Sequence, residues 1–283
     1  MKDLKLVEIK VHGYECKFWY LKDDKFIGQR VALGKYEPYV TKLMLDQINE
    51  GDVVVDVGAN IGYDTVLFAK KVGKNGKVYS IEPDPTNFAI LEKNIKSNGL
   101  KNVVVVKAAL GNANKKMKFF ESEENFGDHR VWGESKMTME IFCRRLDDLL
   151  KDLGGKEVNF IKIDTQGWEP AVIEGAKETI QNYKPTIFFE YWPWAYHQAK
   201  LGGKEMTEFL RQNYGSTNYI DEYIQIYLGK NQNWLDRNFK VNEKNNYGNL
   251  WVKKDKDFGF YWGQLQDFWL KKWVKRMLSR PLT

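Results

Sequence analysis

The sequence predicts an α/β fold, in which a mostly parallel sheet is covered by helices on both faces. From residue 53 onward, short apolar stretches alternate with stretches of helical periodicity, which is the rhythm of a parallel sheet. The run TIFF at 186–189 is nearly continuous and apolar, as strands buried on both faces are. After the apolar run at 53–55, Gly58 and Gly62 mark a sharp turn, so the chain passes directly from a strand into a helix.

The first 50 residues lead into this sheet. Apolar and polar residues alternate over 1–34, which predicts a few short antiparallel strands. Glu37 and Pro38 then open a helix, in which apolar residues recur at helical spacing until Gly51 ends it. We therefore expect an N-terminal β cover at 1–35, a main domain at 36–254 and a C-terminal extension at 255–283.

The next stretch supplies two strand–helix repeats and a third strand. The first helix carries apolar residues up to Val72, and the strand after it ends at Glu82. Asp84 is a good N-cap residue and Pro85 suits the first helical turn, so the second helix begins there. The third strand is the valine run at 103–106.

The remaining elements are expected to extend the sheet. Strands at 115–122 and 137–143 bracket a polar loop at 123–136. The segment 159–169 supplies a strand and a turn, and a helix follows from Pro170 to about Asn182. The last strands are expected in the first half of 186–194, at 219–227 and at 249–254.

The glycine turn and the strand after it predict a pocket for S-adenosylmethionine. Glycines at 58 and 62 lack the Cβ atoms that would block a cofactor, and the first N–H groups of the next helix point at whatever binds there. Asp56, close to this turn, suits a cofactor that ends in an amino acid. Glu82 lies twenty residues beyond Gly62, about where α/β folds place an acid that binds a ribose.

Two alternatives stay open for this turn. A nicotinamide or flavin dinucleotide site has glycines at the first, third and sixth positions, which are Gly58, Asn60 and Tyr63 here. A pyrophosphate would therefore fit poorly. The other alternative is a structural glycine turn that binds no ligand.

Composition and charge narrow the class of protein. The chain has 283 residues, 43% of them hydrophobic, which is enough for a large core. Much of the net charge of +6 lies in 263–280, so the body is nearly balanced and no nucleic-acid partner is expected. Cys16 and Cys143 are far apart, which predicts neither a disulfide nor a zinc site. A cytoplasmic location is the default, because we find no signal peptide and no run of about 18 apolar residues.

Five blocks of the sequence match a known family in order and spacing over roughly residues 36–192. They are VVVDVGANIGYDT at 53–65, VYSIEPDP at 78–85, VVVVKAALGN at 103–112, RRLDDLL at 144–150 and IKIDTQGWEPAVIEGA at 161–176. By these blocks the chain resembles the FkbM family of methyltransferases. The resemblance implies a Rossmann-like class I methyltransferase fold with a seven-stranded sheet. It also implies O-methylation of sugars, polyketides and related small molecules, with S-adenosylmethionine as cofactor.

The same resemblance implies how the cofactor would bind. The methionine end would be lined by Asp56, Gly58, Asn60 and Gly62. Glu82 would hold the ribose hydroxyls, and the adenine would lie between Asp84 and the Ala108–Ala109 region.

One position departs from the family pattern. The block Asp164-Thr165-Gln166-Gly167 has glutamine where the family commonly has glutamate. A glutamine cannot act as a base, and it is a poorer ligand for a hard cation than a carboxylate. We therefore expect no metal, and we place Gln166 among the residues that contact the substrate.

Asp164, Glu190 and His129 are the candidates for catalysis. Asp164 ends a buried strand and can orient or deprotonate an acceptor; alternatively it caps the helix that begins near Pro170 or ties down the glycine turn. Glu190 follows apolar residues, so it belongs either to the site or to a structural ion pair. His129 is a candidate because a histidine side chain can accept a proton near neutral pH, although a loop histidine can simply be solvated. Arg130 beside it can bind an anion or a sugar hydroxyl.

Aromatic residues gather after the strand that ends near Glu190. Trp192 and Trp194 could stack on a sugar ring, which makes them candidate substrate contacts. They could equally form an aromatic core under the C-terminal strands.

The C-terminal extension has a separate character. Its apolar residues at 263–280 fall on one helical face, opposite Lys271, Lys272, Lys275 and Arg276. Such a helix suits an anionic membrane surface, and it also suits packing on its own domain or dimerisation.

The function expected from these observations is O-methylation of a hydroxyl on a sugar, a glycan or a glycosylated small molecule, with S-adenosylmethionine as methyl donor. Two rivals stay open. An RNA methyltransferase would use the basic tail, although the nearly neutral body argues against it. The second is a scaffold that no longer binds cofactor and instead binds glycan or membrane.

Overall fold

The computed structural model describes residues 3–120, 122, 129–134, 138–155, 157–215, 217–220, 225–229, 235 and 239–253, with only the backbone in 217–220 and 225–229. Residues Met1–Lys253 form one compact unit. The expected amphipathic helix at 263–280 and most of the polar loop at 123–136 lie outside the described residues. Among the described helices, none combines the length and apolar character needed to cross a bilayer.

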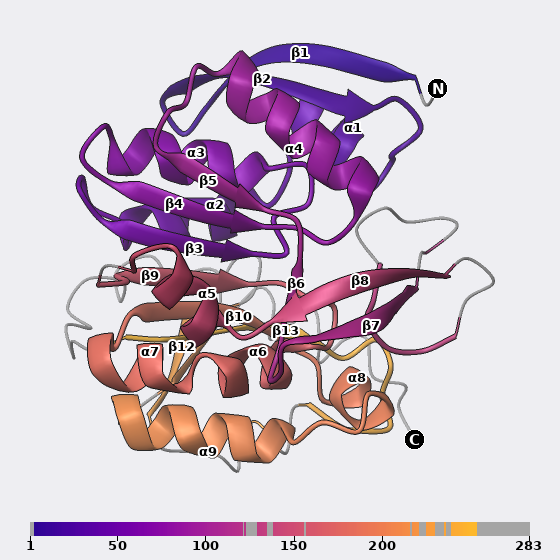
Figure 1. Cartoon of the computed structure of the whole chain (residues 1–283), viewed down its shortest axis with the longest axis vertical. Helices are drawn as coiled ribbons and strands as arrows, with labels where there is room; N and C mark the ends of the chain where they lie inside the picture. The colour runs from indigo at the N-terminus through magenta and orange to yellow at the C-terminus, as the bar shows by residue number, and fades with distance from the viewer. Residues whose placement is uncertain are drawn as a thin grey trace, which may run out of the picture. The chain divides into compact units, whose positions relative to one another are not determined.

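Strands and helices alternate through most of the chain (Figure 1). The strands are β1 (Leu4–Val11), β2 (Tyr14–Leu21), β3 (Val53–Val57), β4 (Lys77–Ile81), β5 (Val103–Val106), β6 (Ala109–Leu110), β7 (Lys115–Phe120), β8 (Thr138–Arg144), β9 (Phe160–Ile163), β10 (Thr186–Tyr191), β11 (Thr217–Ile220), β12 (Gln225–Gly229) and β13 (Gly248–Val252). The helices are α1 (Gly28–Ala32), α2 (Pro38–Asp46), α3 (Tyr63–Val72), α4 (Pro85–Ser97), α5 (Leu146–Asp152), α6 (Glu169–Gly175), α7 (Lys177–Tyr183), α8 (Pro193–Gln198) and α9 (Gly203–Tyr214).

The central sheet has the strand order β12-β11-β13-β10-β9-β3-β4-β5. The five strands from β10 to β5 are parallel, and β13, β11 and β12 extend the sheet by antiparallel pairing. The sheet is therefore mixed and has eight strands, not the seven expected. The difference arises at 219–227, which contributes to two paired strands, β11 and β12, where we expected one.

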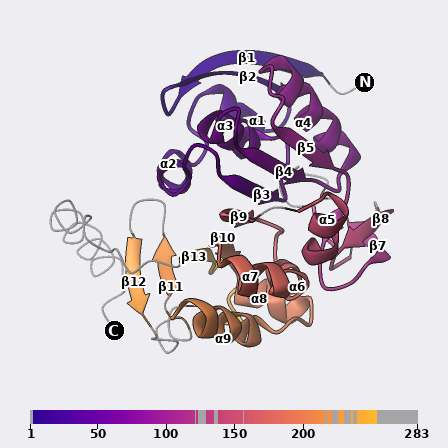
Figure 2. The ribbon, with the colours of Figure 1, turned by 60° about the vertical axis from the view of Figure 1, so that its left-hand side comes forward.

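Two apolar layers cover the faces of the parallel strands. Because side chains alternate along a strand, Val54 and Phe160 face one layer while Val55 and Ile161 face the other. The first layer contains α2, α3 and the β1–β2 hairpin, and the second contains α5, α6, α7 and α9. Figure 2 shows α3 and α6–α9 on opposite sides of the strands. All five residues of β3 are buried, as its apolar sequence predicts.

The N-terminal segment is a hairpin followed by a helix. Strands β1 and β2 pair in antiparallel register from Leu4–Leu21 to Val11–Tyr14, as the alternating pattern predicts. Residues 28–32 form α1, where we expected another strand. The cause is Asp24, whose carboxylate accepts hydrogen bonds from the N–H groups of Phe26, Ile27 and Gly28 and so starts a helical turn.

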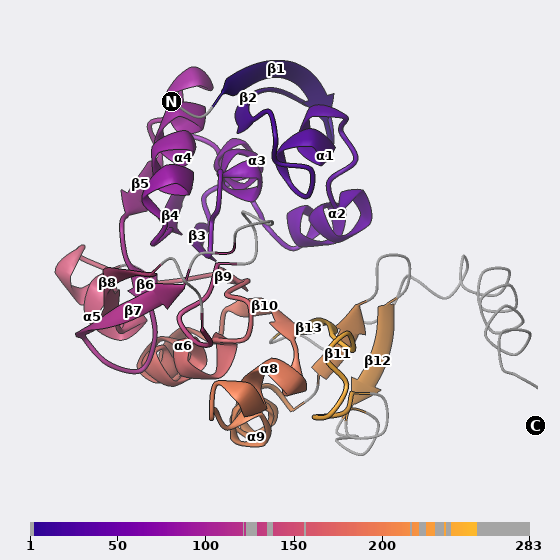
Figure 3. The same ribbon diagram turned by 90° about the vertical axis from the view of Figure 1, so that its right-hand side faces the viewer.

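The expected strands around the polar loop are present as β7 and β8. They join β6 in a separate three-stranded sheet, which lies on the opposite side of Figure 3 from β11 and β12. A bridge between Phe120 and Arg130 continues the pairing into the loop. This small sheet thereby brings His129 and Arg130 toward the carboxyl ends of the parallel strands.

The expected helix from Pro170 to about Asn182 is broken into α6 and α7. The second helix has its own N-terminal cap, because the Asp147 carboxylate accepts hydrogen bonds from the N–H and hydroxyl groups of Thr179. The break between the two helices lies against Gly111. Gly175 permits this contact, because a Cβ atom on residue 175 would overlap the Gly111 carbonyl oxygen.

Candidate active site

The strand order reverses between β3 and β9. From β3 the chain moves outward through β4 to β5, and it returns to β9 on the other side of β3. Open α/β sheets bind ligands at such a switch point, beyond the carboxyl ends of the strands. Gly58 follows β3 and Asp164 follows β9, and the Asp164 N–H donates to the Val57 carbonyl oxygen at 3.0 Å. The glycine turn and the candidate acid are therefore neighbours.

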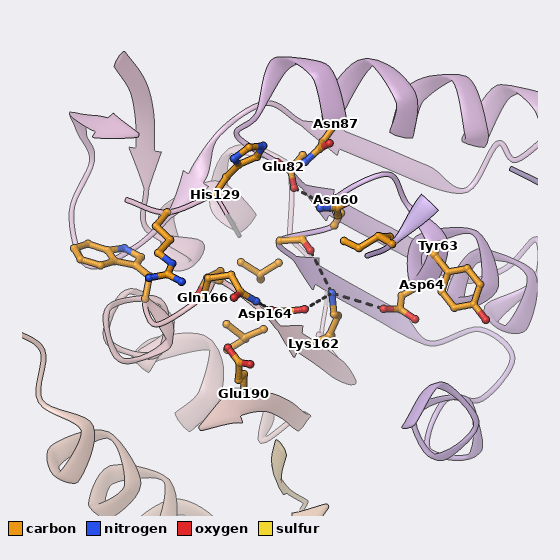
Figure 4. Close-up of a pocket in the computed structure, with 18 of the residues that line it drawn as sticks. Asn60, Tyr63, Asp64, Glu82, Asn87, His129, Lys162, Asp164, Gln166 and Glu190 are labelled. Atoms are coloured by element: carbon orange, nitrogen blue, oxygen red, sulfur yellow. Dashed lines mark hydrogen bonds and ion pairs between the residues drawn. The ribbon is translucent and has the colours of Figure 1, made fainter. Parts of the chain in front are cut away.

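A cleft of about 830 Å³ opens at this point. Eleven of the candidate site residues line it: Gly58, Asn60, Glu82, Ala108, Ala109, His129, Arg130, Asp164, Gln166, Glu190 and Trp192. Figure 4 shows that the labelled residues come from both sides of the switch point and surround one space. Four candidates do not line the cleft, namely Asp56, Gly62, Asp84 and Trp194.

Glu82 lies at one end of the cleft, directly after β4. Its two carboxylate oxygens accept hydrogen bonds from the N–H groups of Asn60 at 2.8 Å and Asp84 at 2.9 Å. Burial raises the pKa of Glu82 to about 8, although these two N–H groups favour the charged form. The carboxyl group is thus fixed in direction and is costly to charge without a further hydrogen-bond donor.

The two glycines of the turn are needed for packing, in addition to the role predicted for them at the cofactor. A Cβ at Gly58 would overlap the Asp164 carbonyl oxygen, and one at Gly62 would overlap the Leu91 side chain. Both residues also have positive φ, 76° and 85°. They are therefore required by the close packing of β3, β9 and α4 around the turn, and Gly62 does not reach the cleft. Asn60 has φ 51° and its side-chain oxygen accepts from the Ile61 N–H, which stabilises this left-handed turn.

A row of polar side chains crosses the sheet beneath the turn. We call Ser80, Thr65, Asp56 and Lys162 the polar row. The Thr65 hydroxyl lies 2.6 Å from Asp56 Oδ2 and 2.8 Å from the Ser80 hydroxyl. Lys162 Nζ lies 3.4 Å from Asp56 Oδ1 and donates to the Gly58 carbonyl oxygen at 3.2 Å. Asp56 is therefore a fully buried support for the turn, and it does not line the cleft.

Sequence reasoning missed Lys162, because a single lysine inside an apolar strand gives no indication of its partners. Its ammonium group also lies within ion-pair distance of Asp64 at 3.7 Å and Asp164 at 3.9 Å. Burial alone would lower the pKa of Lys162, but the carboxylates of Asp56, Asp164 and Asp64 outweigh it and raise the pKa above its ordinary value. Lys162 is therefore a permanent positive charge at the floor of the cleft (Figure 4).

Asp64 was also missed. It lies in the first turn of α3, lines the cleft and has a side chain only 9% exposed. Burial raises the pKa of Asp64, and the nearby Lys162 ammonium opposes that rise. The available signal was an acid directly after the glycine turn, at a position where the α3 dipole favours negative charge.

Asp164 is held by the turn that joins β9 to α6. Its Oδ1 atom accepts a hydrogen bond from Gln166 Nε2 at 2.9 Å, while 35% of the side chain stays exposed. The alternative role as a helix cap is not what the structure shows. Instead, Glu169 Oε1 accepts from the N–H and hydroxyl groups of Thr165 at 2.8 and 2.9 Å, and thereby fixes the turn.

His129 lines the cleft, but its ring nitrogens are engaged. Nδ1 accepts a hydrogen bond from the Ser122 N–H at 2.8 Å, which places the proton of the neutral ring on Nε2. Nε2 lies 4.0 Å from Asp84 Oδ2. This arrangement favours Asp164 over His129 as proton acceptor. Asp84 is itself the N-cap of α4, since it accepts from the Asn87 N–H at 2.7 Å.

Three tryptophans form what we call the aromatic wall: Trp132, Trp192 and Trp194. Their ring centroids lie 5.5 to 6.4 Å apart. The Arg130 guanidinium lies 4.8 Å from the Trp132 ring and 5.0 Å from the Trp192 ring. Trp132 Nε1 donates to the Gln166 carbonyl oxygen at 2.8 Å, so the wall is attached to the Asp164 turn.

The other candidates lie around these groups. Glu190 lies on β10 opposite Asn249 of β13, and both residues line the cleft. Ala108 and Ala109 are buried beside β5, at the end of the cleft that contains Glu82. Sequence reasoning had not considered Trp132, Lys244 or Tyr247, because they come from segments far apart in the chain. Trp192 joins them, since its Nε1 donates to the Lys244 carbonyl oxygen and its ring lies 5.6 Å from Tyr247.

Comparison with known proteins identifies the family. The methyltransferase FkbM domain matches residues 56–225, which is more than half of the chain. The hexuronic acid methyltransferase AglP of Haloferax volcanii is 26% identical over 227 residues, which cover 79% of this chain and 88% of that protein. The 2-O-methyltransferase NoeI of Sinorhizobium fredii is 26% identical over 176 residues, which cover 56% and 70% of the two chains.

A solved structure of methyltransferase FkbM from Methylobacillus flagellatus is similar with a TM-score of 0.44 and 17% identity, over 72% of this chain and 55% of that one. The site fits the family's cofactor, because a buried acid follows β4 and a second buried carboxylate, Asp64, has one oxygen without a hydrogen-bond partner among the described residues. The chain belongs to the FkbM family and is an S-adenosylmethionine-dependent methyltransferase.

Proposed function

We propose that this enzyme methylates an oxygen atom of a sugar, glycan or glycosylated small molecule. The observation that carries the proposal is the aromatic wall: its Trp192 lines the cleft, and its Trp132 is hydrogen-bonded to the Asp164 turn. Tryptophan rings stack on the apolar faces of sugars, and their N–H groups and neighbouring polar side chains bind hydroxyls. AglP is named a hexuronic acid methyltransferase, which supports a sugar acceptor, and NoeI is named a 2-O-methyltransferase, which supports transfer to an oxygen atom.

In this proposal the cleft has two ends. Glu82 binds the ribose hydroxyls of the cofactor, and Ala108 and Ala109 flank its adenine. When bound, S-adenosylmethionine supplies an electrophilic methyl group on its sulfonium centre. The acceptor occupies the other end, between the aromatic wall and Glu190, with Arg130 contacting its polar groups.

Asp164 is the proposed proton acceptor. Its carboxylate lies between the two ends of the cleft, and the Gln166 amide fixes its orientation (Figure 4). A hydroxyl that donates to Asp164 turns its lone pairs toward the methyl group, and its proton can pass to the carboxylate as the new bond forms. The Lys162 ammonium group lies 3.9 Å from Asp164 Oδ2, so a positive charge faces this carboxylate from the floor of the cleft.

The test is methyl transfer to a panel of sugar conjugates, read out by the mass gain of the acceptor. We expect the Asp164→Asn variant to lose about 10² to 10⁴ in kcat, the usual contribution of a general base. Its affinity for S-adenosylhomocysteine should stay within a few-fold of the wild type. Asp152→Asn is the matched control, because Asp152 is exposed on α5. No transfer to any sugar conjugate by a protein that binds the cofactor would contradict the proposed acceptor class.

A further inference from the structure

The floor of the cleft carries an excess of negative charge. Three carboxylates, from Asp56, Asp64 and Asp164, lie within 4 Å of the single Lys162 ammonium group. The side chains of Asp56, Asp64 and Lys162 are 0%, 9% and 8% exposed, so water does little to compensate this imbalance. Buried charges of one sign are costly unless they are paired or hydrogen-bonded.

The three carboxylates differ in how well they are compensated. Asp56 Oδ2 accepts a hydrogen bond from Thr65, and its Oδ1, which has no hydrogen-bond partner among the described residues, lies 3.4 Å from Lys162 Nζ. Asp164 accepts a hydrogen bond from Gln166. Asp64 has Lys162 at 3.7 Å, which is an ion-pair distance but too long for a good hydrogen bond. Its Oδ1 atom is buried and has no hydrogen-bond partner among the described residues. Of the three carboxylates, Asp64 is therefore the least compensated, and a further cation beside it would stabilise its negative charge.

A cationic donor bound in the cleft can reach Asp64. Asp64 lies in the first turn of α3 and lines the cleft next to the glycine turn. The methionine moiety of the family's cofactor carries an α-ammonium group, which is a compact cation with three N–H donors. This ammonium group would supply the positive charge and the hydrogen-bond donors that compensate the Asp64 carboxylate.

We propose that Asp64 binds the α-ammonium group of the methionine moiety of S-adenosylmethionine. The proposal rests on the cofactor assignment and is independent of the acceptor. It fixes the direction of the cofactor: the ribose lies at Glu82 and the amino-acid end lies at Asp64. In Figure 4, Lys162 lies between Asp64 and Asp164, and Gln166 and Glu190 lie on the far side. The acceptor end of the cleft therefore stays open.

Lys162 has a complementary part in this arrangement. Its ammonium group is held by Asp56 and by the Gly58 carbonyl oxygen, so it cannot move toward Asp64 without losing those contacts. It lowers the cost of keeping Asp64 charged, and it leaves the carboxylate available to a second cation. The cofactor would then complete a chain of alternating charges from Asp56 through Lys162 and Asp64 to its own ammonium group.

Titration calorimetry with two ligands at pH 8 tests the proposal. The ligands are S-adenosylhomocysteine and its deaminated analogue, in which hydrogen replaces the amino group. The wild type should bind S-adenosylhomocysteine roughly ten- to a hundredfold more tightly than the analogue, the range expected for a hydrogen bond to a charged group. The Asp64→Asn variant should lose most of that preference by weakening S-adenosylhomocysteine alone. Asp46→Asn, at an exposed acid of α2, is the matched control and should retain the preference.

Each contrary outcome has a separate meaning. If the wild type binds both ligands equally, or if Asp64→Asn weakens both by the same factor, the role of Asp64 is wrong while the enzyme and its sugar acceptor stand. If the wild type binds neither ligand, the cofactor site itself is wrong. Should Asp64→Asn fail to fold, the wild-type comparison and the Asp64→Glu variant decide, because a glutamate that retains the charge should keep part of the preference.

Discussion

Glu82 shows how a single buried carboxyl group can couple cofactor binding to pH. Its pKa of about 8 means that the ligand-free enzyme holds a proton on Glu82 at neutral pH. Ribose hydroxyls donate best to the charged carboxylate, so binding should release this proton.

We therefore predict that the affinity for S-adenosylhomocysteine rises as pH increases from 6 to 8, by roughly tenfold or more, and levels off above the pKa. The sign follows because the binding-competent form is the deprotonated one. Calorimetry at several pH values, in buffers of different ionisation enthalpy, measures both the affinity and the released proton. The Glu82→Gln variant should bind more weakly and with a shallower dependence on pH; equal slopes in both proteins would contradict the role of Glu82.

Gly58 provides a prediction about packing. A methyl group there would overlap the Asp164 carbonyl oxygen, and the residue also has φ 76°. We expect Gly58→Ala to lower the free energy of unfolding by more than about 3 kcal/mol or to prevent folding. Gly154 separates the two causes, because it has φ 70° but open space around its Cα. Gly154→Ala should cost only about 1 kcal/mol, and denaturant unfolding of both variants measures the difference.

A site residue can be recognised from the sequence when the residues next to it in the chain already indicate its position in the fold. Gly58, Glu82 and Asp164 follow apolar strands, so their position at the strand ends can be read from the chain itself. The roles of Lys162 and Asp64 depend on partners that lie on other elements. These partners become neighbours only when β9 pairs with β3. Gly58 shows a further limit, because the Asp164 carbonyl oxygen that it packs against lies far away in the sequence, and this packing requirement could not be predicted.

At the level of elements, the turn between β9 and α6 is the part that positions the candidate catalytic acid. Glu169 begins α6 and ties down this turn through Thr165 and the Gly167 N–H. Gln166 has φ 53° within it, a conformation that is costly for a residue with a side chain. Burial raises the pKa of Glu169, and the Thr165 donors oppose the rise.

We predict that Glu169→Ala reduces kcat by about tenfold or more, because Asp164 and Gln166 lose their fixed geometry. The dissociation constant of S-adenosylhomocysteine should change much less, since Glu82 and the glycine turn are untouched. The unfolding free energy should fall by about 1–3 kcal/mol, the cost of unsatisfied buried groups. Glu169→Gln keeps an acceptor oxygen and should recover part of kcat. Equal losses in kcat and in cofactor affinity would argue against a role specific to this turn.

The elements that the sequence predicted well are those with strong local patterns. The valine-rich strands, the helix after Asp84 and the β1–β2 hairpin all appear where expected. The errors lie where the carboxylate of a residue outside a helix caps its first turn. Asp24 caps the first turn of α1, so residues 28–32 are helical. Asp147 caps the first turn of α7, so this helix begins separately from α6. Neither cap can be inferred from the periodicity of the segment that it affects.

On the scale of the whole chain, the compact unit ends at Lys253. The basic segment at 263–280 follows it, and its sequence suits an anionic membrane surface. We propose that this segment gives the enzyme a peripheral contact with the membrane. The number of strands could not be predicted, because the pairing of β11 with both β12 and β13 is a long-range property of the sheet.

We predict that a chain truncated after Lys253 retains its thermal midpoint and its affinity for S-adenosylhomocysteine. The truncated chain should lose flotation with liposomes that contain anionic lipid, while the full chain floats and is released by salt. Replacing Lys271, Lys272, Lys275 and Arg276 by glutamine in the full chain is the control for charge. Equal flotation of the full and truncated chains would rule out the membrane role, and a change in oligomeric state would instead favour dimerisation.

The aromatic wall gives this enzyme a built-in optical reporter. Trp132 and Trp192 lie about 5 Å from the Arg130 guanidinium, and a charge that close to an indole shifts both the energy and the quantum yield of its emission. A sugar that stacks on the wall would displace water from these rings and change their distance from that charge. Intrinsic fluorescence can therefore rank acceptors in the presence of S-adenosylhomocysteine, when no methyl group can be transferred and no product accumulates.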